Sequence, residues 1–332
     1  MEQRSLNIKD RSHNIANSIV DCIGQTPLVR LNSLFSSSEA SVYAKLEMMN
    51  PGGSMKDRPA RYIIEQGLRD GTIKPNSHLI ESTSGNLGIG LALAAKKYGL
   101  KFTCVVDPKI TSMNLKIITC LGAHIDMVKD PDEHGSYLQS RIRRVQELVL
   151  HDPNGYWINQ YANPLNWQAH YHGAGQEIVD QMDGQIDVLV CAVSTTGSIL
   201  GISRRVKEAY PHTRIVAVDA VGSIIFGTPS QIRELPGIGA NRVPELFSPH
   251  EIDQVIHVND RESVQGCQKL LEREGIFAGG SSGSLVAALE KLVPTLPASS
   301  NVVTVFADRG ERYLDSVYDD RWVDQLPQSY NV

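Results

Sequence analysis

The sequence predicts an α/β protein with two lobes, each a mostly parallel twisted sheet flanked by helices. The chain has 332 residues, more than one hydrophobic core usually serves, so two lobes are expected. Strand-like apolar runs alternate with helix-like segments and no hairpin signal separates them, which is typical of parallel sheets covered on both faces. Glycine-rich loops follow several of these runs, where a strand passes into a helix.

The elements of the first half are predicted from the periodicity of apolar residues and from the glycine and proline residues between them. The alternating or apolar runs predict strands at residues 28–31, 42–47, 79–80, 102–106 and 124–128. Helical spacing predicts helices from residue 56 and at residues 89–98, 112–121 and 136–150.

The second half repeats the same alternation. A strand near residues 156–159 ends at Asn163-Pro164 and is predicted to cross into the second lobe. Further strands are expected at residues 188–193, 215–220, 255–258 and 302–306, and helices at residues 173–182 and 199–210, after residue 258 and after residue 284.

Composition excludes several classes of function. The net charge is −5 and the longest basic cluster is residues 141–144, so nucleic acid is not an expected partner. No apolar run reaches membrane length and the first 14 residues are polar, so we expect no membrane association and a cytoplasmic protein. The five cysteines are scattered without metal-ligand spacing, so we expect free thiols, mostly in the core, and no metal.

Lys56 is the candidate catalytic residue. It follows the glycine-containing loop 50–55, at the mouth of a helix whose apolar positions Ile63, Ile64 and Leu68 recur at helical spacing. There the helix dipole and the neighbouring Arg58 favour a neutral, nucleophilic amine, as in lysines that form Schiff bases. The alternative is a solvated lysine in the first turn of a surface helix.

Two more loops of small hydroxyl residues lie between a strand and a helix. The first, residues 82–86, suits a carboxylate or a phosphate, or is a tight turn with Ser84 as the helix N-cap. The second, residues 194–198, suits a phosphate, because exposed backbone N–H groups at a helix N-terminus bind anions. Neither loop has the spacing of a nucleotide-binding fingerprint. A third loop, 236–240, is either a turn or a substrate-facing lid.

Taken together, five segments resemble the cysteine synthase group of fold-type II pyridoxal-phosphate enzymes. They are residues 50–58, 82–88, 194–198, 237–240 and 279–284, and the resemblance covers about residues 18–320. It implies a fold like that of the tryptophan synthase β-subunit, pyridoxal 5′-phosphate as cofactor and a homodimer. It also implies a large cofactor-binding domain of residues 1–41 and 161–332 and a small substrate-closing domain of residues 42–160.

The resemblance also implies roles for single residues. Lys56 would attach the cofactor and act as general base, Asn86 would bind the cofactor's 3-oxygen, and Ser281 would face its pyridine nitrogen. A hydroxyl there weakens the cofactor as an electron sink, which favours replacement of a β-substituent. The cofactor's phosphate would be held by Ser194, Thr195, Thr196, Gly197 and Ser198, and the substrate's α-carboxylate by Ser82, Thr83, Ser84 and Gln160.

Two departures from the family pattern concern the second substrate. Ser194 replaces the family's usual glycine and Tyr161 its usual phenylalanine, and each adds a hydroxyl. With segments 48–60, 158–163 and 234–240, these residues are similar to family members that join O-phospho-L-serine to L-glutamate on the way to 2,3-diaminopropionate for siderophores. Tyr161 and Ser194 would then position glutamate. Arg141, otherwise part of a solvated helix face, would pair with the phosphate of phosphoserine.

Two alternatives stay open. One is a cysteine synthase that uses O-acetylserine or O-phosphoserine with sulfide, against which Tyr161 and Ser194 count. The other is a catalytically inactive homologue that serves as a binding partner, against which the presence of Lys56 and Asn86 counts.

Overall fold

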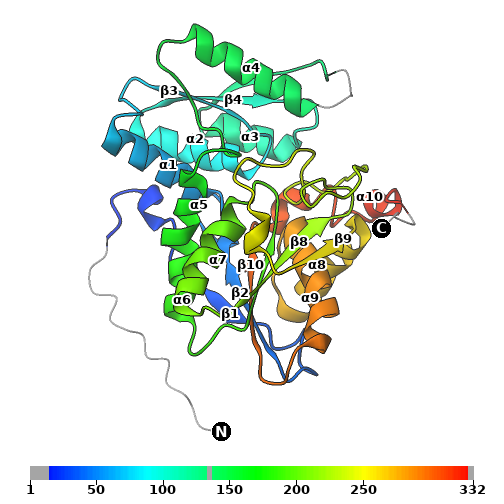
Figure 1. Cartoon of the computed structure of the whole chain (residues 1–332). Coiled ribbons are helices and arrows are strands. Elements are labelled where there is room, and N and C mark those ends of the chain that lie inside the picture. The colour runs from blue at the N-terminus through cyan, green and yellow to red at the C-terminus, as the bar shows by residue number, and fades with distance from the viewer. Residues whose placement is uncertain (1–14, 133–136, 328–332) are drawn as a thin grey trace.

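Two sheets, each with its own core, organise the computed structural model of the chain (Figure 1). The structure describes residues 15–132 and 137–327; the parts of the expected domains at 1–14, 133–136 and 328–332 lie outside the described residues. The α/β class and the mostly parallel sheets are therefore confirmed.

The larger sheet has six strands in the order β1-β2-β10-β7-β8-β9. All neighbours are parallel except β1, which pairs antiparallel with β2 at one edge. The strands are β1 (Leu28–Arg30), β2 (Ser41–Leu46), β7 (Val188–Ala192), β8 (Arg214–Ala220), β9 (Gln254–Val258) and β10 (Asn301–Phe306).

Helices cover both faces of this sheet, so its central strands are buried on both sides and read as continuous apolar runs. One face carries α8 (Asp260–Glu274) and α9 (Gly280–Leu292), and the other carries α5 (Leu165–His170), a π-helical turn (Tyr171–Gly175), α6 (Gln176–Gln181) and α7 (Gly197–Ala209). The short helix α10 (Asp320–Asp324) follows near the C-terminus.

The smaller sheet has four parallel strands in the order β5-β4-β3-β6. Its strands are β3 (His78–Ser82), β4 (Lys101–Val106), β5 (His124–Met127) and β6 (Gly155–Trp157). Its helices are α1 (Asp57–Asp70), α2 (Asn86–Tyr98), α3 (Ser112–Cys120) and α4 (Tyr137–His151). The apolar positions of α1 that the sequence singled out, Ile63 and Ile64, are fully buried in its core.

Three sequence expectations need correction. The small domain was expected to begin at residue 42, but β2 pairs with β10 in register Val42↔Val302, so Ser41–Leu46 belongs to the larger sheet. The single helix expected at 173–182 is broken by the π-helical turn, and α5 was not expected. The strand β1 was expected, but its antiparallel pairing with β2 across a connection of 10 residues was not.

The two sheets bring their functional loops together where the lobes meet (Figure 1). In open parallel sheets, ligands bind outside the carboxyl ends of the strands, and here β2, β3 and β7 are followed by the loops that the sequence singled out. All five cysteines are free thiols and three are buried, as expected. Within the two described ranges, no helix is long and apolar enough to cross a membrane.

Candidate functional site

Lys56 is the N-cap residue of α1, which confirms its expected place at the mouth of a helix. The loop before it is held from both sides. The Met55 N–H donates to the Ala307 carbonyl at the end of β10 (2.8 Å), and the Lys56 N–H donates to Ser54 Oγ (3.2 Å). These bonds fix the backbone that carries the lysine amine against the larger sheet.

Burial lowers the pKa of Lys56 to about 8, and the carboxylate of Asp308 opposes that shift. The sequence-based explanation through Arg58 is wrong. The Arg58 guanidinium turns away into ion pairs with Glu47 (2.6 Å) and Glu177 (2.7 Å), which neutralise its charge. Loss of water around the amine, and not repulsion by a like charge, therefore brings Lys56 close to its reactive form.

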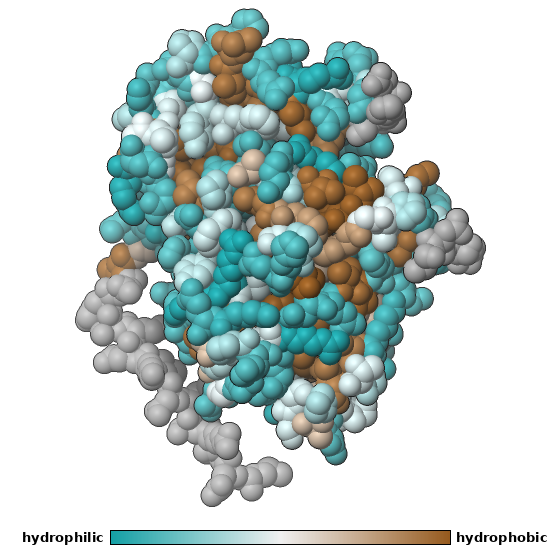
Figure 2. Space-filling view, in the orientation of Figure 1, coloured by the Kyte–Doolittle hydropathy of each residue, from teal (hydrophilic) through white to brown (hydrophobic). Residues whose placement is uncertain are grey.

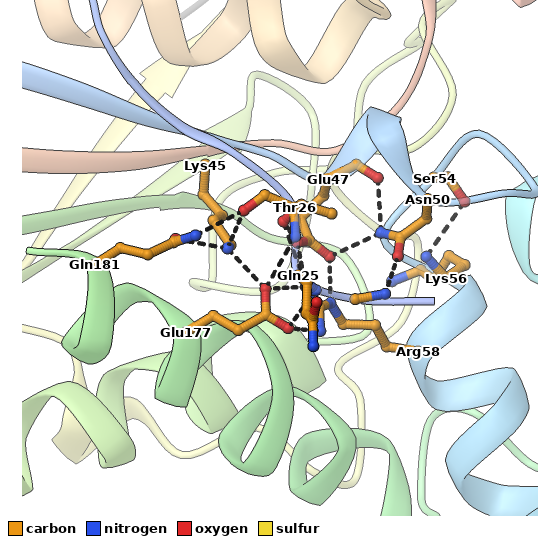
Figure 3. Close-up of polar contacts among 11 residues, drawn as sticks. Gln25, Thr26, Lys45, Glu47, Asn50, Ser54, Lys56, Arg58, Glu177 and Gln181 are labelled. Atoms are coloured by element: carbon orange, nitrogen blue, oxygen red, sulfur yellow. Dashed lines mark hydrogen bonds and ion pairs between the residues drawn. The ribbon is translucent and has the colours of Figure 1, made fainter. Parts of the chain in front are cut away.

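A buried ion cluster lies next to the lysine loop (Figure 3). Glu177 of α6 accepts from Arg58 and from Lys45 of β2, each at 2.7 Å, and from the backbone N–H of Gln25 and Thr26. Burial opposes ionisation of Glu177, but the bonds from Arg58 and Lys45 prevail and lower its pKa to about 2. The cluster thus ties the N-terminal segment, β2, α1 and α6 together at the junction of the lobes.

Lys56 opens into a pocket of about 410 Å³ whose walls carry hydroxyl groups. Several of the residues predicted at the site line it: Lys56, Ser194, Thr195, Ser198 and Ser281. Gly237 of the third loop is also in the wall. Five predicted residues from three separate segments, together with Gly237 from a fourth, therefore meet at one pocket.

Thr196 and Gly197 shape the loop beneath that pocket. Thr196 has left-handed backbone conformation (φ 64°) and its hydroxyl donates to the Thr195 carbonyl (2.7 Å). A Cβ on Gly197 would lie 2.6 Å from Cγ of Asn166, so this position has no room for a side chain. The pair turns the chain sharply from β7 into α7, which leaves the N-terminus of a 13-residue helix at the pocket.

Asn86 is joined to a carboxylate that sequence reasoning missed. Its Nδ2 donates to Asp308 Oδ2 (2.7 Å), its Oδ1 accepts from Arg312, and Tyr313 donates to the same Asp308 oxygen (2.8 Å). The other oxygen, Oδ1, is buried and has no hydrogen-bond partner in the described part of the chain. The sequence did contain a signal for Asp308. It follows the last apolar strand, β10, which ends at the same edge of the sheet as β7.

The residues predicted to bind the substrate carboxylate form a second group on the smaller lobe. Gln160 Nε2 donates to the Ser82 carbonyl (3.3 Å), and the Thr83 hydroxyl accepts from the Gly85 N–H (3.4 Å). Ser84 is not an N-cap, because Gly85 holds that place in α2 without a side-chain cap. The Ser82 hydroxyl is buried and unpaired among the described residues.

Arg141 reaches into this group from α4. Its Nη1 donates to Ser84 Oγ (2.7 Å), and its Nε lies 3.2 Å from Asp107. With 15% of its side chain exposed, Arg141 is not part of a solvated helix face. A guanidinium therefore lies directly beside the loop that the sequence predicts to bind a carboxylate or a phosphate.

Asn166 connects the two groups and was missed from the sequence. Its Nδ2 donates both to the Gln160 carbonyl (2.7 Å) and to Thr195 Oγ1 (3.3 Å). It lies on α5, which the sequence did not predict, and that explains the omission. One amide thus holds a predicted substrate residue and the hydroxyl loop in fixed relation.

Glu81 adds an unexpected acid under the substrate loop. Burial raises its pKa to about 8, although backbone N–H groups, including those of Asn159 and Gln160, act against the shift. One of its carboxyl oxygens is buried without a partner in the described part of the chain. Near neutral pH this side chain is mostly a neutral acid.

Comparison with known proteins assigns the family. A family model described as "Pyridoxal-phosphate dependent enzyme" matches residues 19–308. The chain belongs to this family. The fold is accordingly that of a fold-type II pyridoxal-phosphate enzyme, and its cofactor is pyridoxal phosphate.

Solved structures of this family are similar over nearly the whole chain. An O-acetylserine-dependent cystathionine β-synthase from Helicobacter pylori is 34% identical, with a TM-score of 0.86, and the match covers 92% of this chain and 99% of that one. An O-ureido-L-serine synthase is 28% identical (TM-score 0.84; 96% and 98% covered). A hydrogen sulfide-producing enzyme from Fusobacterium nucleatum is also 28% identical (TM-score 0.85; 91% and 99% covered).

The pocket fits the cofactor of a pyridoxal-phosphate-dependent enzyme. Such an enzyme must hold an aldehyde, a phosphate and a pyridine nitrogen. The pocket is lined by Lys56, by Ser194 and Ser198 at the N-terminus of α7, and by Ser281.

Proposed function

We propose that the protein is an N-(2-amino-2-carboxyethyl)-L-glutamate synthase, which joins O-phospho-L-serine to L-glutamate by β-replacement and releases phosphate. The product would be a precursor of L-2,3-diaminopropionate for siderophore biosynthesis. The observation that carries the proposal is the contact of Arg141 with Ser84 (2.7 Å), because it adds a cation at the anion-binding loop. A phosphorylated serine matches that charge, and an acetylated serine does not.

Different residues of the chain bind the substrate, bind the cofactor and transfer the proton. The cofactor supplies an electron sink when it is bound. Ser82, Thr83, Ser84 and Gln160 hold the substrate's α-carboxylate, Asn86 holds the cofactor's 3-oxygen, and Ser281 its pyridine nitrogen. The phosphate of the cofactor rests on Ser194, Thr195, Thr196, Gly197 and Ser198. Lys56, whose amine is close to neutral, takes the proton from Cα as the C–O bond to phosphate breaks at Cβ.

The second substrate enters at Cβ. Its amine nitrogen forms the new C–N bond, and its proton balances the one that returns to Cα. Tyr161 and Ser194 place hydroxyls for a polar amino acid there, and Arg141 holds the departing phosphate. The names of the three related enzymes include O-acetylserine, O-ureido-L-serine and hydrogen sulfide, which supports a serine derivative with a variable second group. Sulfide is the competing second substrate.

The same proposal includes the location, the assembly and the partners of the protein. We infer a cytoplasmic homodimer, as the family resemblance implies, in which the lobe around the four-stranded sheet closes over the substrate. Small-molecule amino acids are the only partners that this activity requires.

A substrate series tests the function. The loaded enzyme is given O-phospho-L-serine or O-acetyl-L-serine, each with L-glutamate or sulfide, and products are identified by mass spectrometry. Phosphoserine with glutamate is expected to give the condensed amino acid and one phosphate per product. Formation of cysteine alone would make the protein a cysteine synthase. No product from any pair would favour the inactive homologue.

Arg141→Ala tests the observation that carries the proposal. We expect kcat/KM for phosphoserine to fall about 10- to 100-fold, as loss of a charge-assisted hydrogen bond predicts, with little change for acetylserine. Arg143→Ala is the matched control, because Arg143 lies two residues along α4 with an exposed contact to Ser140. Equal losses for both serine derivatives would contradict the phosphate role.

A further inference from the structure

The long connection between β8 and β9, residues 221–253, is the least explained part of the pocket. It lies between the lobes in Figure 1, and Gly237 within it lines the pocket beside Lys56. The Gly239 N–H donates to the Val193 carbonyl (2.7 Å), directly before Ser194. Figure 2 shows apolar surface where the lobes meet, and Ile232 (79% exposed) and Val243 (49% exposed) belong to this connection.

Arg242 places a cation from this connection on Tyr161. Its guanidinium carbon lies 5.0 Å from the centroid of the Tyr161 ring, and the Leu246 N–H donates to the Tyr161 carbonyl (3.1 Å). The residue therefore holds a defined place on the tyrosine that the proposed function puts beside the second substrate. Its only ion pair among the described residues is with Glu245, a half-exposed side chain three positions along.

Arg233 is a second cation of this connection, bonded to Asn241, the residue before Arg242. It donates through Nη1 to the Ile238 carbonyl (2.9 Å) and through Nη2 to Asn241, while its buried Nε has no partner in the described chain. Both bonds go to neutral oxygens. The Arg233 charge therefore faces no carboxylate within ion-pair distance in the part of the chain that the structure describes.

The charges around Tyr161 are mixed, and cations predominate. Arg141, Arg233 and Arg242 all interact electrostatically with its hydroxyl, and Glu81 opposes them. Burial raises the pKa of Glu81 to about 8, so near neutral pH this acid contributes little negative charge. Asp219 and Asp260 attract Arg233 from the larger lobe. Among these three guanidinium groups, Arg141 lies 3.2 Å from Asp107 and Arg242 pairs with Glu245, whereas Arg233 has no ion pair in the described part of the chain.

We propose that Arg242, together with Arg233, binds the side-chain carboxylate of an acidic amino acid that serves as the second substrate. The inference rests on the proposed function and adds to it the residues that select an acidic over a neutral amine donor. Arg141 then serves the leaving phosphate from the smaller lobe, while the pair on the larger lobe serves the incoming carboxylate. The bond-forming step is unchanged: the amine nitrogen bonds to Cβ, phosphate is the leaving group, and the amine proton balances the one returned to Cα.

Discrimination between L-glutamate and L-glutamine tests the inference. The two differ in charge but hardly in shape, so kcat/KM for each, measured with saturating phosphoserine, isolates recognition of the carboxylate. In Arg242→Met we expect the preference for glutamate to fall about 10- to 100-fold, mainly through KM for glutamate. Arg242→Lys, which keeps the positive charge, should keep part of the preference for glutamate over glutamine. Single-turnover release of phosphate from phosphoserine alone should stay as in the wild type, which also shows that the variant is folded.

Arg204→Met is the matched control. Arg204 also lies over an aromatic ring, that of Trp167 at 4.4 Å, and also pairs with a glutamate, Glu251 at 2.7 Å, but the proposed function gives Trp167 no contact with the second substrate. The inference is wrong if Arg242→Met leaves the glutamate-to-glutamine ratio unchanged, or lowers it no more than Arg204→Met does. If the wild type releases phosphate but consumes sulfide and not glutamate, the proposed function itself fails and the inference with it.

Discussion

The pKa of Lys56 shows how the position of a residue can be predicted correctly while the cause of its pKa shift is not. Its place at a helix mouth follows from the sequence pattern, but the nearby positive charge of Arg58 is neutralised by Glu47 and Glu177. Such pairing depends on residues far away in the chain, so no local pattern reveals it. Burial remains as the cause that lowers the pKa of Lys56 to about 8.

This pKa predicts how the protein takes up its cofactor. Covalent attachment of pyridoxal phosphate requires the neutral amine, so its rate should rise with pH around 8 and level off near 9. Well below pH 8 the rate should fall about tenfold per unit, because the neutral fraction falls by that factor. Stopped-flow absorbance on the cofactor-free protein measures it. Borohydride reduction followed by peptide mass spectrometry should find the reduced cofactor attached to Lys56. In Lys56→Ala no other lysine should carry it. A rate that is flat between pH 7 and 9 would contradict this assignment.

At the scale of elements, the ion cluster around Glu177 fixes where α1 begins. A single carboxylate of α6 satisfies Lys45 of β2, Arg58 of α1 and two backbone N–H groups. The side chain of Lys45 is completely buried, so removal of its counter-charge leaves a cation without water. The cluster thus determines the orientation of α1 and, through it, of the lysine loop.

Glu177→Gln should therefore destabilise the protein by about 3 kcal/mol at pH 7, the usual cost of breaking a buried pair. Glu208→Gln is the matched control, because that half-exposed carboxylate pairs with Arg205 on a helix surface and its loss should cost under about 0.5 kcal/mol. Urea unfolding followed by circular dichroism measures both. Because the pKa of Glu177 is lowered to about 2, its contribution is complete above the ordinary value of 4.5 and is lost as the pH falls toward 2. Equal losses in the two variants would refute a structural role for the cluster.

At the scale of the whole molecule, the sequence predicted what local patterns encode. Strand and helix alternation, the hydroxyl loops and Lys56 are all local, and Lys56, Ser194, Thr195, Ser198 and Ser281 do meet at one pocket. Contacts between distant segments escaped prediction. Asp308 reaches Asn86 over 222 positions, and Asn166 lies on an unpredicted short helix.

The division of the chain was harder to predict for a related reason. Strand β2 leads directly into the lysine loop, so in sequence it reads as the start of the smaller lobe, but it hydrogen-bonds to β10 along its whole length. Pairing of parallel strands depends on partners that are remote in the chain, here about 260 positions away. A boundary drawn from local signals misses such a partner.

Buried acids should make the stability of the whole molecule depend on pH. In the folded state the pKa of Glu81 is about 8, and an unfolded glutamate titrates near 4.5, so between these values the folded protein holds more protons. The stability that this residue contributes therefore falls as the pH rises from about 5 to 8. Glu81→Gln should gain about 1–3 kcal/mol relative to the wild type over that range. The surface variant Glu290→Gln should show no such trend. Unfolding free energies at pH 5 and pH 8 test this, and a constant difference between Glu81→Gln and the wild type would contradict it.

The amide of Asn166 has one further consequence. It donates to the Gln160 carbonyl and to the Thr195 hydroxyl, so any ligand that shifts one of these loops shifts the energy of the other. Thermodynamic reciprocity then requires equal effects in both directions: the factor by which bound cofactor tightens amino-acid binding is the factor by which the amino acid tightens cofactor binding. If that factor favours binding, saturating amino acid should slow the loss of cofactor from the protein to the same extent that cofactor tightens amino-acid binding.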